Sequence, residues 1–581
     1  MRISFQWKRN LFSTSSTVTS IIAGRAILSL LAAPLAVGGE PVQTKAPVVF
    51  GVDTAGETLL EVHGVQYWRH EPFYAALDEL GAGFVVVHLM PVSTPGKDTS
   101  AEMGEVVRSI DAGMRTHGKT YALNLETPNF VSRMEITPGV NEFEQPGGRH
   151  LWLLRPEWLR PILDQPGPAA LKALVYDEAE HMQLSNNKFA GSPGDRFDAP
   201  FLVNTKVMGP EAAYDALVAE CVRIREQHYG NRIPLTTEQV WPDLFHIFAR
   251  AGWTAVPKLL KEHFTPVVLC IALGAALQYQ DKGIHFWASP DLWGFDQYPG
   301  HSPEALRSAL LMGYWLGAEC LYVENIDFDR WEKRHPKADA KGSLVHWSDE
   351  NHYELTAHGK VVRDFAKEYV PQHPRTVDWR QYRPRVAIIR LPDGGWGQFS
   401  AESGHGEAAS RNRLLGNPDM PLDEPAREWL HVWSALTHGV VKPGAISYNN
   451  PIVYPAFQDF FVPVDSVAVF DHQVTGPVLD GVDCFVVCGH ALSADTFSAV
   501  AKRVKQGTMC IIARRLFSRH NPESKVLPGK WTVLDRFDGP ELGDALRPFL
   551  GPADEARYRF VNGTVVFRRG AEDDSVETKG L

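Results

Sequence analysis

Acidic residues stand at or just beyond the ends of several short apolar runs in this sequence. The carboxylates in these positions are Glu126, Asp177, Glu178, Glu238 and Glu324, with Asp291 and Asp296 a few residues beyond a further run. No Lys or Arg stands beside them at the ends of the runs. Carboxyl groups held near one another have raised pKa values, and a pair with one protonated and one ionised member can hydrolyse a glycosidic bond.

Aromatic and histidine side chains crowd the same segments. A sugar ring has apolar C–H faces, so a carbohydrate site needs flat aromatic surfaces beside groups that bind hydroxyls. The candidate substrate-binding residues are Glu126, Asp177, His181, Trp241, Trp287, Asp291, Trp293, Asp296, Tyr298 and His301, and His285 is a further hydroxyl-binding candidate. Trp287 lies inside an apolar run, so a place in the hydrophobic core is an equal alternative for it.

We assign hypothetical roles to these carboxylates. Glu178 is the expected general acid/base and Glu324 the nucleophile or base, and the reserve candidates for the second role are Glu238, Asp291 and Asp296. One alternative is a catalytically inactive carbohydrate-binding protein on the same fold. Another is a metal-dependent hydrolase that uses Asp177, Glu178 and His181, although no second cluster has metal-ligand spacing. The sequence therefore predicts no cofactor and no metal.

Short apolar runs alternate with helical patterns from about residue 47 to residue 370. The first five predicted strands are Val48–Asp53, Phe84–Met90, Thr120–Glu126, Ala173–Glu178 and Pro234–Gln239. Most are continuously apolar, which is typical of parallel strands that are buried on both faces. An example of a helix between strands is Pro303–Gly317, with Ser302 as its N-cap. The alternation predicts a (β/α)8 barrel over residues 45–375, with its site at the carboxyl ends of the strands.

The later strands of the barrel can be counted in two ways. Residues 266–280 contain either a strand or one apolar helix, and their Ala- and Leu-rich second half favours the helix. In that count Ile284–Ser289 is the sixth strand, Cys320–Asn325 the seventh and Ser343–Trp347 the eighth. In the other count Ile284–Ser289 and Cys320–Asn325 are the seventh and eighth.

A second α/β domain is predicted after the barrel. A helix over Tyr353–Val370 closes the barrel region, and a flavodoxin-like three-layer domain follows over residues 383–540. Its predicted strands are Val386–Arg390, Val467–Phe470, Asp483–Val487 and Met509–Ala513. Residues 541–581 form a tail with a β-hairpin at Asn562-Gly563.

Composition limits the class of protein. The chain has 581 residues, 44% of them hydrophobic and 22% charged, and a formal net charge of -11, which excludes a disordered or collagen-like protein. The sequence contains no block of basic residues, so nothing in it indicates nucleic-acid binding. Six cysteines are too few for a disulfide scaffold, and those in apolar runs are expected to be free and buried.

The first 40 residues have the features of a targeting segment. Lys8 and Arg9 precede a 12-residue apolar run, Ala26–Val37, which is too short to span a bilayer but fits a signal peptide. An unprocessed N-terminal tail is the alternative. We therefore expect a secreted or periplasmic protein without a membrane-spanning segment.

Two parts of the sequence resemble known families. The stretch Asp483–Ala513 (DCFVVCGHALSADTFSAVAKRVKQGTMCIIA) resembles the glutamine-amidotransferase-like domain that follows the barrel in β-galactosidase-type glycoside hydrolases, and the first domain resembles TIM-barrel glycoside hydrolases in layout. The resemblance implies a non-catalytic second domain that supports homo-oligomers.

The resemblance of the barrel also implies an acid/base at the end of strand four and a nucleophile at the end of strand seven, which Glu178 and Glu324 match in the preferred count. Asp177 departs from the Asn that usually precedes the acid/base. The expected function is an exported glycoside hydrolase that acts on an oligo- or polysaccharide.

Overall fold

The computed structural model groups residues Lys45–Leu581 into one compact unit and Met1–Thr44 into another. The structure describes residues 48–54, 66–89, 100–125, 143–145, 149–151, 156–165, 169–184, 202–226, 232–261, 264–292, 300–327, 344–394, 414–417, 419–420, 422–443, 461–523, 525–570 and 575–580. The predicted signal peptide or tail over residues 1–40 lies outside these ranges and stays a prediction. Within them, no helix is long and apolar enough to cross a membrane.

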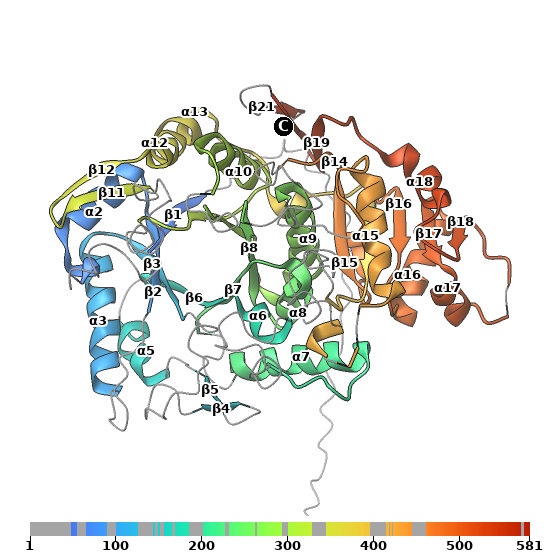
Figure 1. The fold of residues 1–581 in the computed structure, drawn as a ribbon, viewed down its shortest axis with the longest axis horizontal. Helices are drawn as coiled ribbons and strands as arrows, with labels where there is room; N and C mark the ends of the chain where they lie inside the picture. Colours follow the sequence, from blue (N-terminus) through green and yellow to red (C-terminus); the bar gives the residue numbers. More distant parts are fainter. Residues whose placement is uncertain are drawn as a thin grey trace, which may run out of the picture. The chain divides into compact units, whose positions relative to one another are not determined.

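Eight parallel strands close into a barrel, as predicted (Figure 1). The strands are β1 (Val49–Asp53), β2 (Phe84–His88), β3 (Thr120–Asn124), β6 (Leu171–Asp177), β7 (Leu235–Gln239), β8 (Thr254–Leu259), β9 (Trp287–Pro290) and β10 (Cys320–Val323). Their order around the barrel is β1-β10-β9-β8-β7-β6-β3-β2, so each strand pairs with its neighbours in the chain and β10 returns to β1. The helices around it are α2 (Glu71–Leu80), α3 (Ser100–Thr116), α5 (Pro156–Leu163), α6 (Ala179–Leu184), α7 (Pro210–Ile224), α8 (Phe245–Arg250), α9 (Thr265–Gln278) and α10 (Pro303–Trp315).

The preferred count of the later strands was wrong by one. The sixth strand is β8, with the sequence TAVPKL. It was not predicted because a proline argues against a strand and the lysine interrupts the apolar run. Helix α9 is confirmed, but β9 is therefore the seventh strand and β10 the eighth. The segment expected as the eighth, Ser343–Trp347, instead overlaps β11 (Val345–Asp349), which forms a two-stranded antiparallel sheet with β12 (His352–Leu355).

The strand β12 also shortens the helix predicted over Tyr353–Val370. The helix α12 (Ala357–Asp364) begins only after Thr356, whose side chain caps it by accepting a hydrogen bond from the Gly359 N–H group. The helical segment then continues through a π-type turn into α13 (Val370–Gln372).

The interior of the barrel is apolar at one level and polar at the next. Its apolar residues are Phe84, Val86, Ala122, Ala173, Val175, Val256, Trp287, Cys320 and Tyr322. Trp287 therefore takes the place in the core that the sequence left open for it. Because side chains alternate along a strand, the residue two positions after each inward residue also points inward. The polar residues of the candidate site lie further along the strands, at or just beyond their carboxyl ends.

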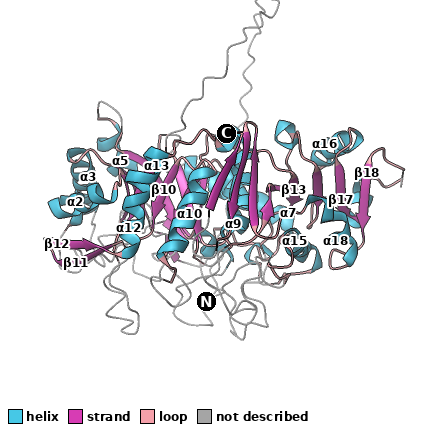
Figure 2. Ribbon diagram, turned by 90° about the horizontal axis from the view of Figure 1, so that it is seen from above, coloured by secondary structure: helices cyan, strands magenta, loops and turns pink. Residues whose placement is uncertain are grey.

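The second parallel sheet has the flavodoxin-like order. Its strands are β13 (Val386–Arg390), β15 (Val467–Asp471), β16 (Cys484–Val487), β17 (Met509–Ala513) and β18 (Lys530–Leu534), arranged as β15-β13-β16-β17-β18. Figure 2 shows α16 (Ala494–Lys505) on one side of this sheet, with α15 (Glu424–Leu436) and α18 (Pro540–Leu546) on the other. The order places the second strand outside the first, which confirms the predicted three-layer class.

A smaller sheet contains the predicted hairpin. It has the order β14-β19-β20-β21, formed by β14 (Val464–Asp465), β19 (Glu555–Phe560), β20 (Gly563–Arg568) and β21 (Ser575–Lys579). Strands β19 and β20 pair antiparallel across the turn before Gly563. The domain boundaries at residues 375, 383 and 541 stay predictions.

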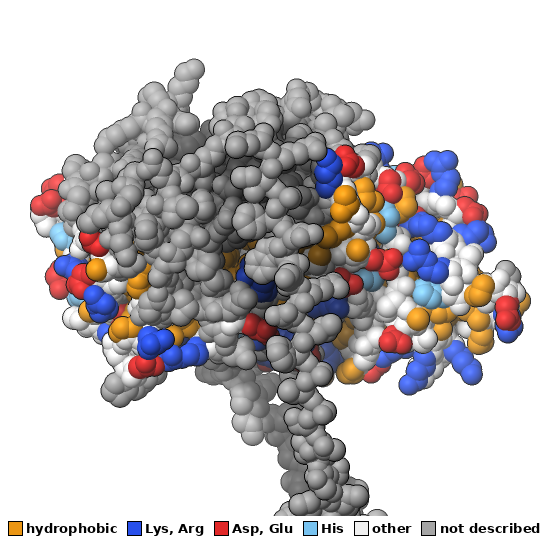
Figure 3. All heavy atoms as spheres, turned by 90° about the horizontal axis from the view of Figure 1, so that it is seen from below, with side chains coloured by type: hydrophobic (Ala, Val, Ile, Leu, Met, Phe, Trp, Pro, Cys, Tyr) orange, Lys and Arg blue, Asp and Glu red, His pale blue; other side chains and the backbone are white. Residues whose placement is uncertain are grey.

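Charged side chains of both signs mix on the described surface of the second α/β region (Figure 3). Examples are the exposed pairs Arg514–Asp535 and Arg547–Asp544. Exposed ion pairs of this kind add little stability, because solvent screens them and the long side chains lose freedom. The stability of this region therefore comes mainly from its apolar core.

Helix α9 joins the barrel to the second sheet. It contacts β8 on one side and the edge strand β15 on the other, and nearly all of its residues are buried. This double contact explains why the helix is apolar all round, since such a helix must be covered on every side. It also covers the edge of the sheet at β15, and the His246 imidazole adds a hydrogen bond to the Val469 carbonyl at 2.8 Å.

Replacing Gly274 with Ala is expected to destabilise the protein by about 2–4 kcal/mol, because a Cβ atom there would lie 1.8 Å from the Val469 carbonyl oxygen. Helix propensity alone would favour Ala by about 0.5–1 kcal/mol, so the sign of the effect identifies the close contact. Gly104→Ala in α3 is the matched control, because the nearest atom there is the flexible Arg108 guanidinium at 3.4 Å. Chemical denaturation measures both, and equal stabilities of the two variants would contradict this account.

Candidate active site

A ring of polar side chains lines the carboxyl-terminal end of the barrel. One such residue lies at or just beyond the end of every strand. These residues are Asp53, His88, Asn124, Asp177, Glu238, Lys258, Asp291 and Glu324. All but Glu324 are buried, and its side chain is only 13% exposed. In a barrel of this kind the active site lies at this end.

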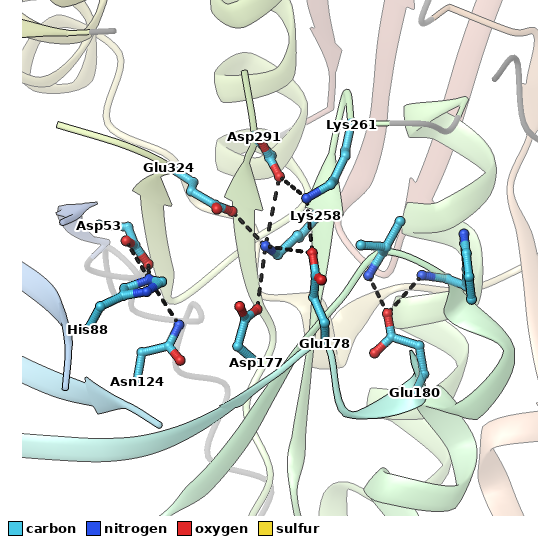
Figure 4. A network of polar contacts seen from close by, with 12 residues as sticks. Asp53, His88, Asn124, Asp177, Glu178, Glu180, Lys258, Lys261, Asp291 and Glu324 are labelled. Carbon is cyan, nitrogen blue, oxygen red and sulfur yellow. Dashed lines mark hydrogen bonds and ion pairs between the residues drawn. The ribbon is translucent and has the colours of Figure 1, made fainter. Parts of the chain in front are cut away.

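Lys258 stands at the centre of the ring (Figure 4). Its Nζ atom lies 2.7 Å from Glu324 Oε2, 3.4 Å from Asp177 Oδ1, 3.5 Å from Glu178 Oε1 and 3.8 Å from Asp291 Oδ2. The expectation that no cation neighbours these carboxylates was wrong. The reason is that Lys258 lies in β8, the strand that was not predicted from the sequence.

A second lysine approaches the same carboxylates from beyond the end of β8. Lys261 Nζ lies 3.0 Å from Glu178 Oε1 and 3.0 Å from Asp291 Oδ2. Leu260, just before it, has φ = 73°, a left-handed conformation that is strained for a leucine. The turn after β8 thus brings two ammonium groups, Lys258 and Lys261, into one cluster of acids.

The two lysines separate the charge states of two carboxyl groups. Burial by itself raises the pKa of Glu324, but the charges of Lys258 and Lys261 outweigh burial and lower that pKa to about 2. Burial raises the pKa of Glu238 well above its usual range, helped by the charges of Glu324 and Asp177 and opposed by Lys258. The pKa values of these two carboxyl groups are therefore shifted in opposite directions, a separation typical of acid–base sites, and Glu324 is ionised at neutral pH.

Glu178 and Glu180 sit at the turn from β6 into α6. Glu178 has φ = 43°, and its N–H group donates a 2.8 Å hydrogen bond to the Glu238 carbonyl. Glu180 Oε1 accepts hydrogen bonds from the N–H groups of Val240 and Trp241, at 2.7 and 3.2 Å. Burial, together with the charge of Glu178, nevertheless raises the pKa of Glu180 well above its usual range. These bonds hold the start of α6 against the segment after β7.

Asp53, His88 and Asn124 form a second polar group in the ring, from β1, β2 and β3. The His88 Nε2 atom lies 2.8 Å from Asp53 Oδ1, and the Asn124 amide lies 3.1 Å from the same nitrogen. None of these three was among the predicted site residues. The available signal was the one used for the acids, namely a polar residue at the carboxyl end of an apolar strand.

The structure brings together five of the predicted site residues, namely Asp177, Glu178, Glu238, Asp291 and Glu324. Trp241 is buried directly after β7, and His301 is buried just before α10, where its carbonyl accepts a hydrogen bond from His358. His285 precedes β9 instead of following it, so it lies at the other end of that strand, where it pairs with Glu319 at 2.5 Å. The predicted residues outside the described part of the chain are Glu126, Trp293, Asp296, Tyr298 and the side chain of His181.

The metal alternative gains no support from the described residues. Among them, no group of three or more His, Cys, Asp or Glu side chains is arranged to hold a metal ion. Asp177 and Glu178, two of the three expected ligands, face the Lys258 ammonium. If Asp177 and Glu178 bound a metal ion instead, the buried Lys258 ammonium would lose two of its counter-charges. Burying a charge without its partner is costly.

The cysteines match the expectation for apolar runs, since all six are free and buried. Cys488 follows β16 at a strand–helix turn, the place where a nucleophile could stand. Burial raises the pKa of its thiol, and the left-handed position in the turn belongs to Gly489, with φ = 82°. Cys488 is therefore part of the core.

His490, in the same turn, is expected to make stability depend on pH. Burial lowers its pKa, but contacts with Asp393 and with Asp423, the latter at 2.9 Å, outweigh burial and raise that pKa to about 9. The folded state thus binds the proton more tightly than the unfolded state. The resulting stabilisation, about 3 kcal/mol, is complete below about pH 6.5 and is lost as pH rises towards 9. Urea unfolding at both ends of this window, for the native chain and for His490→Gln, measures it; an unchanged pH dependence in the variant would contradict it.

Known structures share this fold, although no protein-family model and no curated protein sequence matches the chain. The β-galactosidase of the Antarctic haloarchaeon Halorubrum lacusprofundi is 11% identical, with a TM-score of 0.50 over 89% of this chain and 93% of that one. The β-galactosidase of Marinomonas ef1 is 11% identical over 89% and 95%, with a TM-score of 0.48. The chain therefore shares the fold of the Halorubrum lacusprofundi β-galactosidase.

This similarity confirms the predicted fold. It assigns no role to any residue of this chain, so those roles must be argued from the geometry of the site. One part of the resemblance fails, because Glu324 follows the eighth strand and Asp291 follows the seventh. The correspondence of Glu324 with the family's nucleophile position came from the missed strand β8. Any role for Glu324 must therefore rest on its own surroundings.

Proposed function

We propose that this protein is a glycoside hydrolase that cleaves a glycosidic bond in an oligo- or polysaccharide with retention of configuration. Glu324 is the nucleophile and Glu178 the general acid/base. The fold shared with glycoside hydrolases supports the class of reaction, and the carboxylates at the end of the barrel support the choice of residues.

The separation of Glu178 and Glu324 carries this proposal. Lys258 Nζ lies 2.7 Å from Glu324 Oε2 and 3.5 Å from Glu178 Oε1, so these two oxygens are at most about 6 Å apart. Retaining enzymes hold their two carboxyl groups about 5–5.5 Å apart, whereas inverting enzymes need about 6.5–9.5 Å to admit a water molecule. The spacing supports the retaining mechanism.

The charge state of Glu324 supports its role. A carboxylate nucleophile must be ionised to attack the anomeric carbon, and the low pKa of Glu324 keeps it so at neutral pH. The proton donor must be a neighbouring carboxyl group, and Glu178 directly follows β6, the fourth strand of the barrel. Its left-handed backbone is the kind of strain found at functional sites.

The test is a panel of oligosaccharides and aryl glycosides, with the anomer of the first-formed product followed by proton NMR. We expect release of a sugar whose anomeric configuration matches that of the substrate. Initial release of the opposite anomer would refute the retaining mechanism, and no hydrolysis of any member would refute the enzymatic function.

A catalytically inactive carbohydrate-binding protein is the second candidate. The observation in its favour is that Lys258 and Lys261 both contact Glu178, the carboxyl group that must supply a proton. An ammonium beside a carboxylate favours its ionised form. Under this candidate the panel would give saturable binding by calorimetry without turnover, so the same set of sugars separates the two functions.

We also propose export and self-association. Export rests on Lys8, Arg9 and the apolar run Ala26–Val37, and a homo-oligomer through the second domain rests on the resemblance of Asp483–Ala513. Cell fractionation with N-terminal sequencing of the mature chain tests the first. Sedimentation of the full chain tests the second.

A further inference from the structure

The two lysines of the site carry the same charge and both contact Glu178 and Asp291, but Lys258 also contacts Glu324. Lys258 Nζ lies 2.7 Å from Glu324 Oε2, closer than its 3.4–3.8 Å distances to Asp177, Glu178 and Asp291. The ion pairs of Lys261 are with Glu178 and Asp291. Both ammonium groups are almost fully buried, so solvent screens neither contact.

The proposed reaction changes the charge of Glu324 twice. In the first step a Glu324 oxygen bonds to the anomeric carbon, the glycosidic C–O bond breaks, and the Glu178 proton goes to the leaving oxygen. In the second step a water oxygen bonds to the anomeric carbon, its proton goes to Glu178, and the bond to Glu324 breaks. Glu324 is therefore neutral only in the covalent intermediate, and Lys258 lacks its nearest counter-charge only there.

We propose that Lys258 is a positioning residue that makes Glu324 a good leaving group in the second step, and so prevents the covalent intermediate from accumulating. This inference rests on the proposed function. An ammonium 2.7 Å from the departing carboxylate stabilises the negative charge that develops as the bond to Glu324 breaks. The same contact lowers the pKa of Glu324, and a more acidic carboxyl group leaves more readily.

The closing experiment uses an aryl glycoside with a good leaving group, taken from the substrates that the native chain hydrolyses. With such a substrate the first step is fast, so that kcat reports the second. Lys258→Gln is expected to lower kcat by at least about tenfold, the effect of raising the pKa of Glu324 by one unit or more. A burst of released aryl alcohol and a glycosyl adduct in the intact mass spectrum should accompany the loss.

Lys261→Gln is the matched control, because it removes an equal charge from the same cluster without removing the contact to Glu324. Because the Lys261 charge also lowers the pKa of Glu324, this variant is expected to show a smaller burst and less adduct than Lys258→Gln. Because Lys258→Gln leaves acids without a counter-charge, the double variant Lys258→Gln/Asp177→Asn removes one charge of each sign and protects the fold. It should accumulate the adduct in the same way.

Three outcomes would overturn the inference. Lys258 variants that turn over without a burst or adduct overturn it alone and leave the proposed function intact. An adduct that accumulates equally in Lys261→Gln also overturns it, because the effect would then be one of general charge. A native chain that neither hydrolyses any member of the panel nor is labelled by 2-fluoro glycosyl fluorides overturns both the inference and the proposed function.

Discussion

Replacing Glu324 with Gln is expected to lower kcat/KM by about 10⁴-fold, because an amide cannot form the covalent intermediate and has no charge to stabilise the oxocarbenium-like transition state. The amide has nearly the same shape and can still occupy the place beside Lys258, so the fold should survive. Steady-state kinetics with an aryl glycoside, together with a thermal unfolding curve of each variant, measures the two effects separately.

The smaller variant Glu324→Ala gives an independent check. The cavity it leaves can admit azide, which should restore release of the aryl group and yield a glycosyl azide. The matched control is Asp177→Asn, because Asp177 also contacts the Lys258 ammonium, at 3.4 Å, but has no role in bond formation. We expect Asp177→Asn to lose about tenfold or less. Equal losses of kcat/KM in the Glu324 and Asp177 variants would contradict the assignment. They would show that the loss comes from disturbing the charged cluster and not from removing a nucleophile.

Replacing Glu178 with Gln is expected to affect substrates according to their leaving groups. An alkyl or sugar leaving group needs a proton, so kcat/KM should fall by about 10²–10⁴-fold, the usual contribution of general acid catalysis. An acidic phenol leaves without a proton, so the first step on such a substrate should change by less than about tenfold. Kinetics on a series of aryl glycosides of graded phenol acidity measures the difference.

Glu180 supplies the control for Glu178, since both residues lie at the start of α6. The Glu180 carboxyl accepts hydrogen bonds from the N–H groups of Val240 and Trp241 and therefore holds the backbone. Glu180→Gln is expected to lower the melting temperature and to reduce activity equally for all leaving groups. If Glu178→Gln also shows no dependence on the leaving group, Glu178 is not the proton donor, and Glu238, whose pKa burial raises well above its usual range, becomes the next candidate.

Local sequence patterns predict much of this fold, because the strands are short, apolar and separated by well-marked helices. The predicted strand Pro234–Gln239 differs from β7 by one residue, and Val386–Arg390 and Met509–Ala513 match β13 and β17 completely. The strand β8 was missed for a local reason. Pro257 has no N–H group and Lys258 is charged, and both features argue against a buried strand unless the partner residues are known.

The sequence by itself determined that acids gather at one end of a barrel. Parallel strands end at the same edge, so Asp177, Glu178, Glu238 and Glu324 had to lie near one another once the alternation of strands and helices was recognised. Only the tertiary structure decided what neutralises them. The ion pairs of Lys258 join β8 to residues far apart in the chain, and a pairing of this kind leaves no periodic signal in the sequence. The protonation states of Glu324 and Glu238 depend on the same distances and on burial, which exist only in the closed barrel.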